Sequence, residues 1–122
     1  MADFLVSPPE STDLRIEPSQ LERALRESWP DVRFIKDQVV ESLRWALTIT
    51  PGRELWGELQ PDGQAVALDG DVRDAAEFAR WLRGQVPQRY ALIFYDQGYA
   101  HDVPLTERTS VEELAQPFLI QP

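Results

Sequence analysis

The chain of 122 residues carries a net charge of −9, is 43% hydrophobic and contains no cysteine. This length and apolar content fit a single globular domain with its own core rather than a disordered chain. The missing cysteines exclude disulfides, a thiol nucleophile and a thiolate zinc site. The acidic surface disfavours nucleic acid and anionic membranes as partners and favours a basic macromolecule.

The first dozen residues, MADFLVSPPEST, contain a proline pair and only a three-residue apolar run. We predict a flexible lead-in over 1–12 and a single globular domain over 13–122. The start lacks the basic and apolar parts of an export signal, and no run approaches the roughly 18 apolar residues of a membrane span. We therefore expect a cytoplasmic protein, and one lysine against eleven arginines hints at a bacterial source.

The next segment, 13–17, is a candidate for a first strand. A helix should follow, because Ser19 and Glu22 have the spacing of a capping box and Pro30 would end the helix. Its apolar face would be narrow, with Leu21, Ala24 and Leu25 at helical spacing.

The middle of the chain predicts a meander of short strands joined by tight turns. The segment 42–49 alternates between apolar and more polar residues, which is typical of an antiparallel strand with one buried face. The turn residues PGR and PDG separate it from its successors. The predicted strands are 32–35, 42–49, 54–60 and 64–69.

A second helix should begin after Asp71, which can cap it, with Asp74 near the positive end of the helix dipole. The apolar run 90–95 predicts a strand in the middle of the sheet. Ser110 and Glu113 predict a second capping box and a last short helix that Pro117 limits. The apolar face of the second helix would consist of Ala75, Phe78, Ala79, Leu82 and Val86.

Together these elements predict the α+β class, with helices on one face of a mostly antiparallel sheet of 4–6 strands. Two helices are long and the C-terminal one is short. The expected order is α-β-β-β-β-α-β-α.

Catalytic chemistry has one candidate region, the stretch LIFYDQGYAHDVPL over 92–105. His101, the only histidine, has Asp96 and Asp102 nearby and could act as a general base. No nucleophile motif, metal-ligand spacing or glycine-rich phosphate loop accompanies it. We expect no cofactor and no metal, and we interpret the stretch mainly as a strand followed by a surface loop.

Aromatic residues provide the stronger signal. Trp45 and Trp29 fit a core, whereas Trp56 and Trp81 fall off the apolar faces of their elements. Exposed aromatic side chains surrounded by acids are typical of protein-binding hot spots. The position of Trp81 off the apolar face would be explained equally if Trp81 covered an edge of the sheet. A run of carboxylates can also mark no more than the start of a helix. The predicted partner-binding residues are Trp81, Tyr95, Asp96, Tyr99, His101 and Asp102, with Asp71 and Asp74 as charge support.

The preferred hypothesis is a non-enzymatic inhibitor or immunity-type protein that neutralises a basic protein partner. A small acidic secretion-type chaperone is the first alternative, since the order of elements is similar in outline to that class. A metal-free acid–base enzyme that uses His101 is the second. A monomer and a homodimer both remain open.

Overall fold

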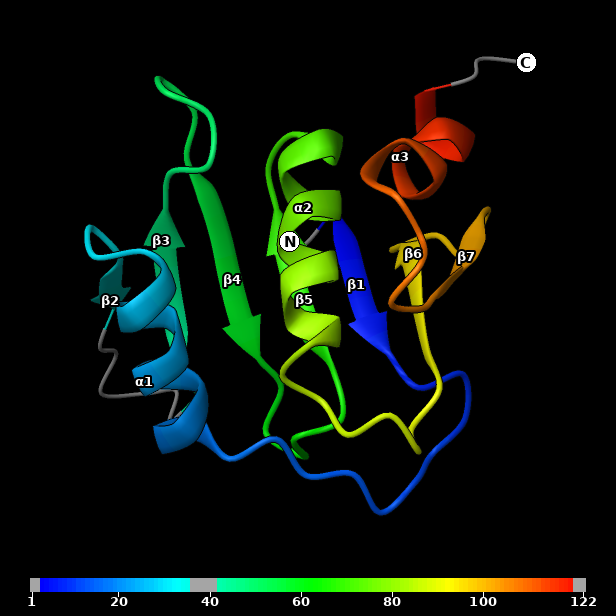
Figure 1. Ribbon diagram of the computed structural model, residues 1–122, viewed down its shortest axis with the longest axis horizontal. Helices are drawn as coiled ribbons and strands as arrows, with labels where there is room; N and C mark the ends of the chain where they lie inside the picture. The colour runs from blue at the N-terminus through cyan, green and yellow to red at the C-terminus, as the bar shows by residue number, and fades with distance from the viewer. Residues whose placement is uncertain (1–2, 36–41, 120–122) are drawn as a thin grey trace.

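The computed structural model describes residues 3–35 and 42–119. Within them, seven strands form one antiparallel sheet and three helices pack on one side of it (Figure 1). The predicted α+β class is confirmed, with more strands than expected. The elements in chain order are β1 (Phe4–Ser7), α1 (Pro18–Ser28), β2 (Arg33–Ile35), β3 (Arg44–Leu47), β4 (Leu55–Leu59), β5 (Val66–Asp69), α2 (Val72–Arg83), β6 (Leu92–Asp96), β7 (Asp102–Leu105) and α3 (Val111–Leu119).

The strand order is β2-β3-β4-β5-β1-β6-β7, so the N-terminal strand lies inside the sheet. Our expectation of a flexible lead-in over 1–12 is therefore wrong for residues 4–7. Phe4 pairs with Leu68 on β5 and with Asp96 on β6. Both partners lie more than 60 residues away in sequence, so no local sequence pattern predicts the strand β1.

The segment 13–17 is not a strand. Its backbone is joined to the turn before β5 by a hydrogen bond from Ile16 N–H to the Gly63 carbonyl, 2.9 Å long. The helix that follows starts at Pro18, with Glu17 at the cap position, so Ser19 and Glu22 do not form the predicted capping box. Proline at the first helical position needs no amide partner, which explains the earlier start.

Other start signals are confirmed. The Asp71 side chain accepts a hydrogen bond from Arg73 N–H at the start of α2. Ser110 and Glu113 exchange the two hydrogen bonds of a capping box before α3, which continues through Pro117. The expectations of a surface loop after 96 and of a central strand over 90–95 are wrong in part, because residues 102–105 form the edge strand β7 and β6 lies next to it.

One hydrophobic core fills the space between the sheet and the helices. Trp45 and Phe78 are fully buried, and their rings stack with 5.7 Å between centroids. The Trp45 indole lies against Gly57 on the neighbouring strand, where any Cβ atom would overlap the ring. Glycine is thus required at this position by the close approach of the indole.

Candidate functional site

The opposite face of the sheet carries none of the described helices (Figure 1). Side chains along a strand point alternately to the two faces of the sheet. The core contains the strand residues that point to the face covered by the helices. Three buried residues point to the opposite face and lie outside the core: Ala67, Ile93 and Tyr95. We call this side of the sheet the bare face. The strand pairings place one row of residues across it: Ile35, Arg44, Glu58, Ala67, Leu5, Tyr95 and Asp102.

Trp56 is the most exposed tryptophan on the described chain, with 43% of its surface accessible. It projects from β4 on the bare face, opposite to the buried Leu55 and Leu59. The sequence pattern predicted this orientation, although Trp56 was not among the predicted partner-binding residues. Beside it lies a shallow hollow of about 150 Å³ that Ala67, Glu58 and other residues of β3, β4 and β5 line.

Tyr99 adds a second exposed aromatic group, with 55% of its surface accessible. Its ring lies 4.6 Å from that of Tyr95, between centroids. The Tyr95 hydroxyl is hydrogen-bonded to Ser7 Oγ at 2.9 Å, which fixes the inner ring on the bare face. Tyr99 has a φ of 59°, a left-handed conformation that is uncommon for a residue with a bulky side chain. Two of the predicted binding residues therefore form one aromatic pair.

Acidic groups surround these rings. Asp69 lies opposite Trp56 in the β4–β5 pairing, and Asp102 lies opposite Tyr95 in the β6–β7 pairing. A hydrogen bond between the Asp3 and Asp69 carboxyl groups raises the pKa of Asp69, with burial and the charge of Asp3 adding to the effect. The outward positions of β4, β5, β1, β6 and β7 hold three acids: Trp56, Glu58, Ala67, Asp69, Leu5, Ser7, Ile93, Tyr95, Asp102 and Pro104. The outward positions of β2 and β3 add two bases, Arg33 and Arg44, and Arg44 borders the hollow beside Trp56.

Trp81 does not belong to this surface. It lies on the helical side of the molecule, where its ring centroid is 5.0 Å from that of Trp29 and 5.3 Å from that of Phe78. Its Nε1 donates a 2.8 Å hydrogen bond to Ser28 Oγ on α1. Trp81 is off the apolar stripe of its own helix because it covers the neighbouring helix.

Asp71 and Asp74 lie at the start of α2 and are used within the fold. Asp74 is 2% exposed and accepts hydrogen bonds from Thr50 Oγ1 and from two nitrogens of Arg53, at 2.7 to 3.1 Å. Asp71 caps α2, and its carboxylate lies 3.6 Å from Arg53. Both carboxylates share the cation Arg53 and are bound within the fold, so we do not place either of them on the bare face.

Asp96 and His101 are neighbours at the end of the sheet near α3. The His101 backbone N–H donates to Asp96 Oδ1 at 3.2 Å, and the imidazole packs edge-on against Phe118 at 5.8 Å. Asp102 points to the bare face by strand alternation. The backbone amide of His101, rather than its imidazole, is thus the partner of the Asp96 carboxylate.

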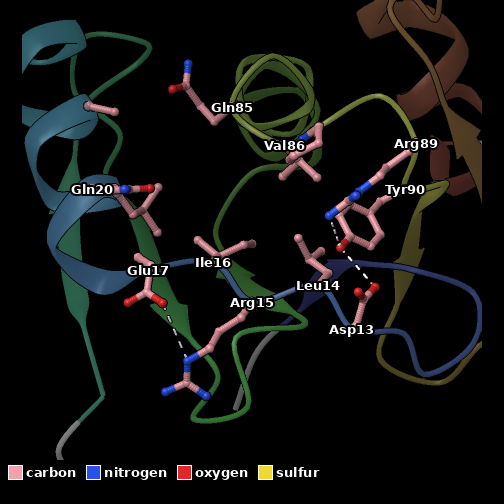
Figure 2. Close-up of a pocket in the computed structure, with 13 residues that line it drawn as sticks. Asp13, Leu14, Arg15, Ile16, Glu17, Gln20, Gln85, Val86, Arg89 and Tyr90 are labelled. Carbon is pink, nitrogen blue, oxygen red and sulfur yellow. Dashed lines mark hydrogen bonds and ion pairs between the residues drawn. The ribbon is translucent and has the colours of Figure 1, made fainter.

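A larger cavity of about 400 Å³ opens between the start of α1 and the loop after α2. Figure 2 shows Leu14 and Ile16 facing Val86 across it. At the rim, Arg89 donates to the Tyr90 hydroxyl, which donates to Asp13, each at 2.9 Å (Figure 2). Arg15, Glu17, Gln20 and Gln85 line the cavity as well, and the first two form an ion pair. No motif in the sequence predicts this cavity.

Among residues 3–35 and 42–119, no group of three or more histidine, aspartate or glutamate side chains is arranged to hold a metal ion. No helix in the same ranges has the length and apolar character needed to cross a bilayer. Comparison with protein-family models, with curated proteins and with solved structures finds no match. The fold and the site thus define an acidic α+β domain with an aromatic, acid-lined bare face.

Proposed function

We propose that this protein is a non-enzymatic binding module of the inhibitor or immunity type, which neutralises a basic protein by binding it with the bare face. The observation that carries this proposal is the exposure of Trp56 and Tyr99 on a sheet face that none of the described helices covers. Exposed large aromatic residues are the commonest anchors of protein interfaces. The acids beside them select a positively charged partner and speed the encounter.

The edges of the sheet support a contact through the face rather than through added strands. The edge strand β7 contains Pro104, which has no amide to donate to an incoming strand. The other edge, β2, has three residues within the part of the chain that the structure describes. Strand addition at either edge would therefore form few backbone hydrogen bonds.

The chaperone alternative requires a broad apolar surface for an unfolded client. The large hydrophobic residues exposed among the described residues are Trp56, Tyr99 and Leu119, and the first two are separated by half-buried or small side chains. Two spaced anchors with acids beside them favour a folded, charged partner over an unfolded apolar one. The enzyme alternative would need His101 to share a substrate site with an acid, and the contacts of its ring are with Phe118.

Site-specific photo-crosslinking in cells that make the protein tests the proposal. A photoreactive amino acid replaces Trp56 in one variant and Arg80, exposed on the helical side, in a matched control. We expect an adduct with a basic protein from position 56 only, and that protein, once purified, should bind the chain more weakly at high salt. Equal adducts from both positions, an acidic adduct or no adduct from position 56 would contradict the proposal.

A further inference from the structure

We infer that the partner inserts a basic amphipathic α-helix, which lies along the strands of the bare face between Trp56 and the Tyr95–Tyr99 pair. This inference rests on the proposed function and adds the shape and the charge of the element that is bound. The inference is based on the spacing of the two aromatic anchors and on the small residue between them, Ala67.

The spacing follows from the strand order. Trp56 is on β4 and Tyr95 is on β6, with β5 and β1 between them. Three strand spacings of about 4.8 Å separate the two anchors by roughly 14 Å across the sheet. A helix with its side chains is about 10–12 Å wide, so one helix fills this space. A partner sheet would need a flatter face, without two protruding aromatic rings.

The floor between the anchors is low. Ala67 lies at its centre on β5 and borders the hollow beside Trp56, and Leu5 follows it on β1. Both side chains are apolar, and Leu5 is half-buried. A helix there would place its apolar stripe on Ala67 and Leu5, with the two aromatic anchors at its sides.

The acids flank this floor on both sides. Glu58 and Asp69 extend from β4 and β5, with Arg44 opposite Glu58 on β3, and Asp102 extends from β7 beyond the tyrosine pair. Asp69 and Asp102 are therefore the acids that face a bound helix without a base opposite them in the strand pairing. Arginine or lysine side chains on both flanks of the bound helix would reach these carboxylates. The helix is therefore expected to be apolar along one stripe and basic on either side of it.

The backbone of Tyr99 gives independent support. Its left-handed φ of 59° suits glycine or asparagine, yet the glycine of this turn is one residue earlier, at position 98. The ring of Tyr99 remains more than half exposed and contacts Tyr95. A strained backbone conformation together with an exposed ring indicates a role of Tyr99 in binding rather than in the stability of the fold.

Two displayed peptide libraries test the inference on the purified full-length protein. One presents charge-balanced helices and the other presents hairpins, each with random outward positions. We expect selected binders to come from the helical library and to be enriched in arginine and lysine. Trp56→Ala and Tyr99→Asn should each weaken them at least tenfold, whereas Glu77→Ala on the exposed side of α2 should not. Asparagine tolerates the left-handed conformation, so Tyr99→Asn isolates the ring.

The outcomes separate the two proposals. Hairpin binders that depend on Trp56 would overturn the bound helix and leave the bare face as the binding surface. Binders that are acidic or insensitive to Trp56→Ala, or the selection of no binder from either library, would contradict both. Amide shifts at Ala67 and Leu5 on titration with a selected helix would confirm its position.

Discussion

The indole Nε1 of Trp81 donates a 2.8 Å hydrogen bond to Ser28 Oγ, and this contact joins α2 to the last residue of α1. The Trp81 ring also packs against Trp29, just after the end of α1. Trp81 is off the apolar stripe of α2 and thus holds α2 and the end of α1 together. Exposure cannot be inferred from the position on one helix alone, because a second helix can cover the residue.

Replacing Trp81 separates this structural role from a binding role. Trp81→Phe keeps most of the ring packing and removes the hydrogen bond, so unfolding should require about 1 kcal/mol less free energy. Trp81→Ala should cost about 2–4 kcal/mol, because it also removes the packing. Urea denaturation measures both values. A Trp81→Phe protein of unchanged stability that no longer binds its partner would restore Trp81 to the interface.

Asp74 should matter for stability and not for partner affinity. Asp74→Ala removes the buried acceptor of Thr50 Oγ1 and of the exposed Arg53 side chain, and should lower the free energy of unfolding by about 1–3 kcal/mol, mainly through the lost hydrogen bonds. Glu77→Ala, one turn later and exposed, should change it by less than about 0.5 kcal/mol. Thermal and urea unfolding of the pair test the contrast, and equal stabilities of the two variants would refute it.

The Asp3–Asp69 pair gives stability a pH dependence of known sign. Because the pKa of Asp69 is raised in the folded state, folding favours the protonated carboxyl. This contribution is fully present below the unfolded pKa of 3.8 and is lost as the pH rises through the raised pKa. The pair is solvent-exposed, so we expect a loss of less than about 1 kcal/mol.

Two matched variants check the origin of this pH dependence. Asp69→Asn and Asp3→Asn each keep an oxygen acceptor and remove one of the two acidic groups. Either should flatten the dependence and make the protein slightly more stable at neutral pH than the wild type. Urea unfolding at a series of pH values from 3 to 8 measures it, and an unchanged slope in both variants would assign the effect to other groups.

Gly57→Ala tests the close approach of Trp45. The new methyl group would overlap the indole ring, which is fully buried and cannot move aside without displacing Phe78. We expect a loss of about 2–3 kcal/mol from overpacking. Gly98→Ala is the control, because a Cβ atom there meets nothing within 4 Å. Similar melting temperatures for the two variants would show that the core is less tightly packed than described.

Much of the fold could be predicted from local patterns, and the exceptions have physical reasons. The α2 cap at Asp71 and the capping box before α3 depend on nearby residues and were predicted correctly. The strand β1 was missed, because it consists of four residues whose partners are distant in sequence. The strand β7 was missed because Pro104 argues against a strand unless an edge position is known.

The candidate site was predictable in part for the same reason. Strand alternation placed Trp56 on the face opposite Leu55, and this orientation is confirmed. The sequence does not show that helices cover only one face, so the prediction includes Trp81 among the binding residues and leaves out Trp56. Tyr95 and Tyr99 were chosen together and do form a ring pair. The buried position of Asp74 could not be predicted from its own helix, because its partner, Arg53, lies on a distant turn.

The most direct test of the account is the dissociation constant of the Trp56→Ala protein with the partner identified by crosslinking. Removal of a central aromatic anchor costs about 2 kcal/mol or more, so we expect binding to weaken about 30-fold or more. The melting temperature should stay close to that of the wild type, since Trp56 lies outside the core. An unchanged dissociation constant, together with weaker binding by variants on the helical side, would contradict the assignment of the bare face.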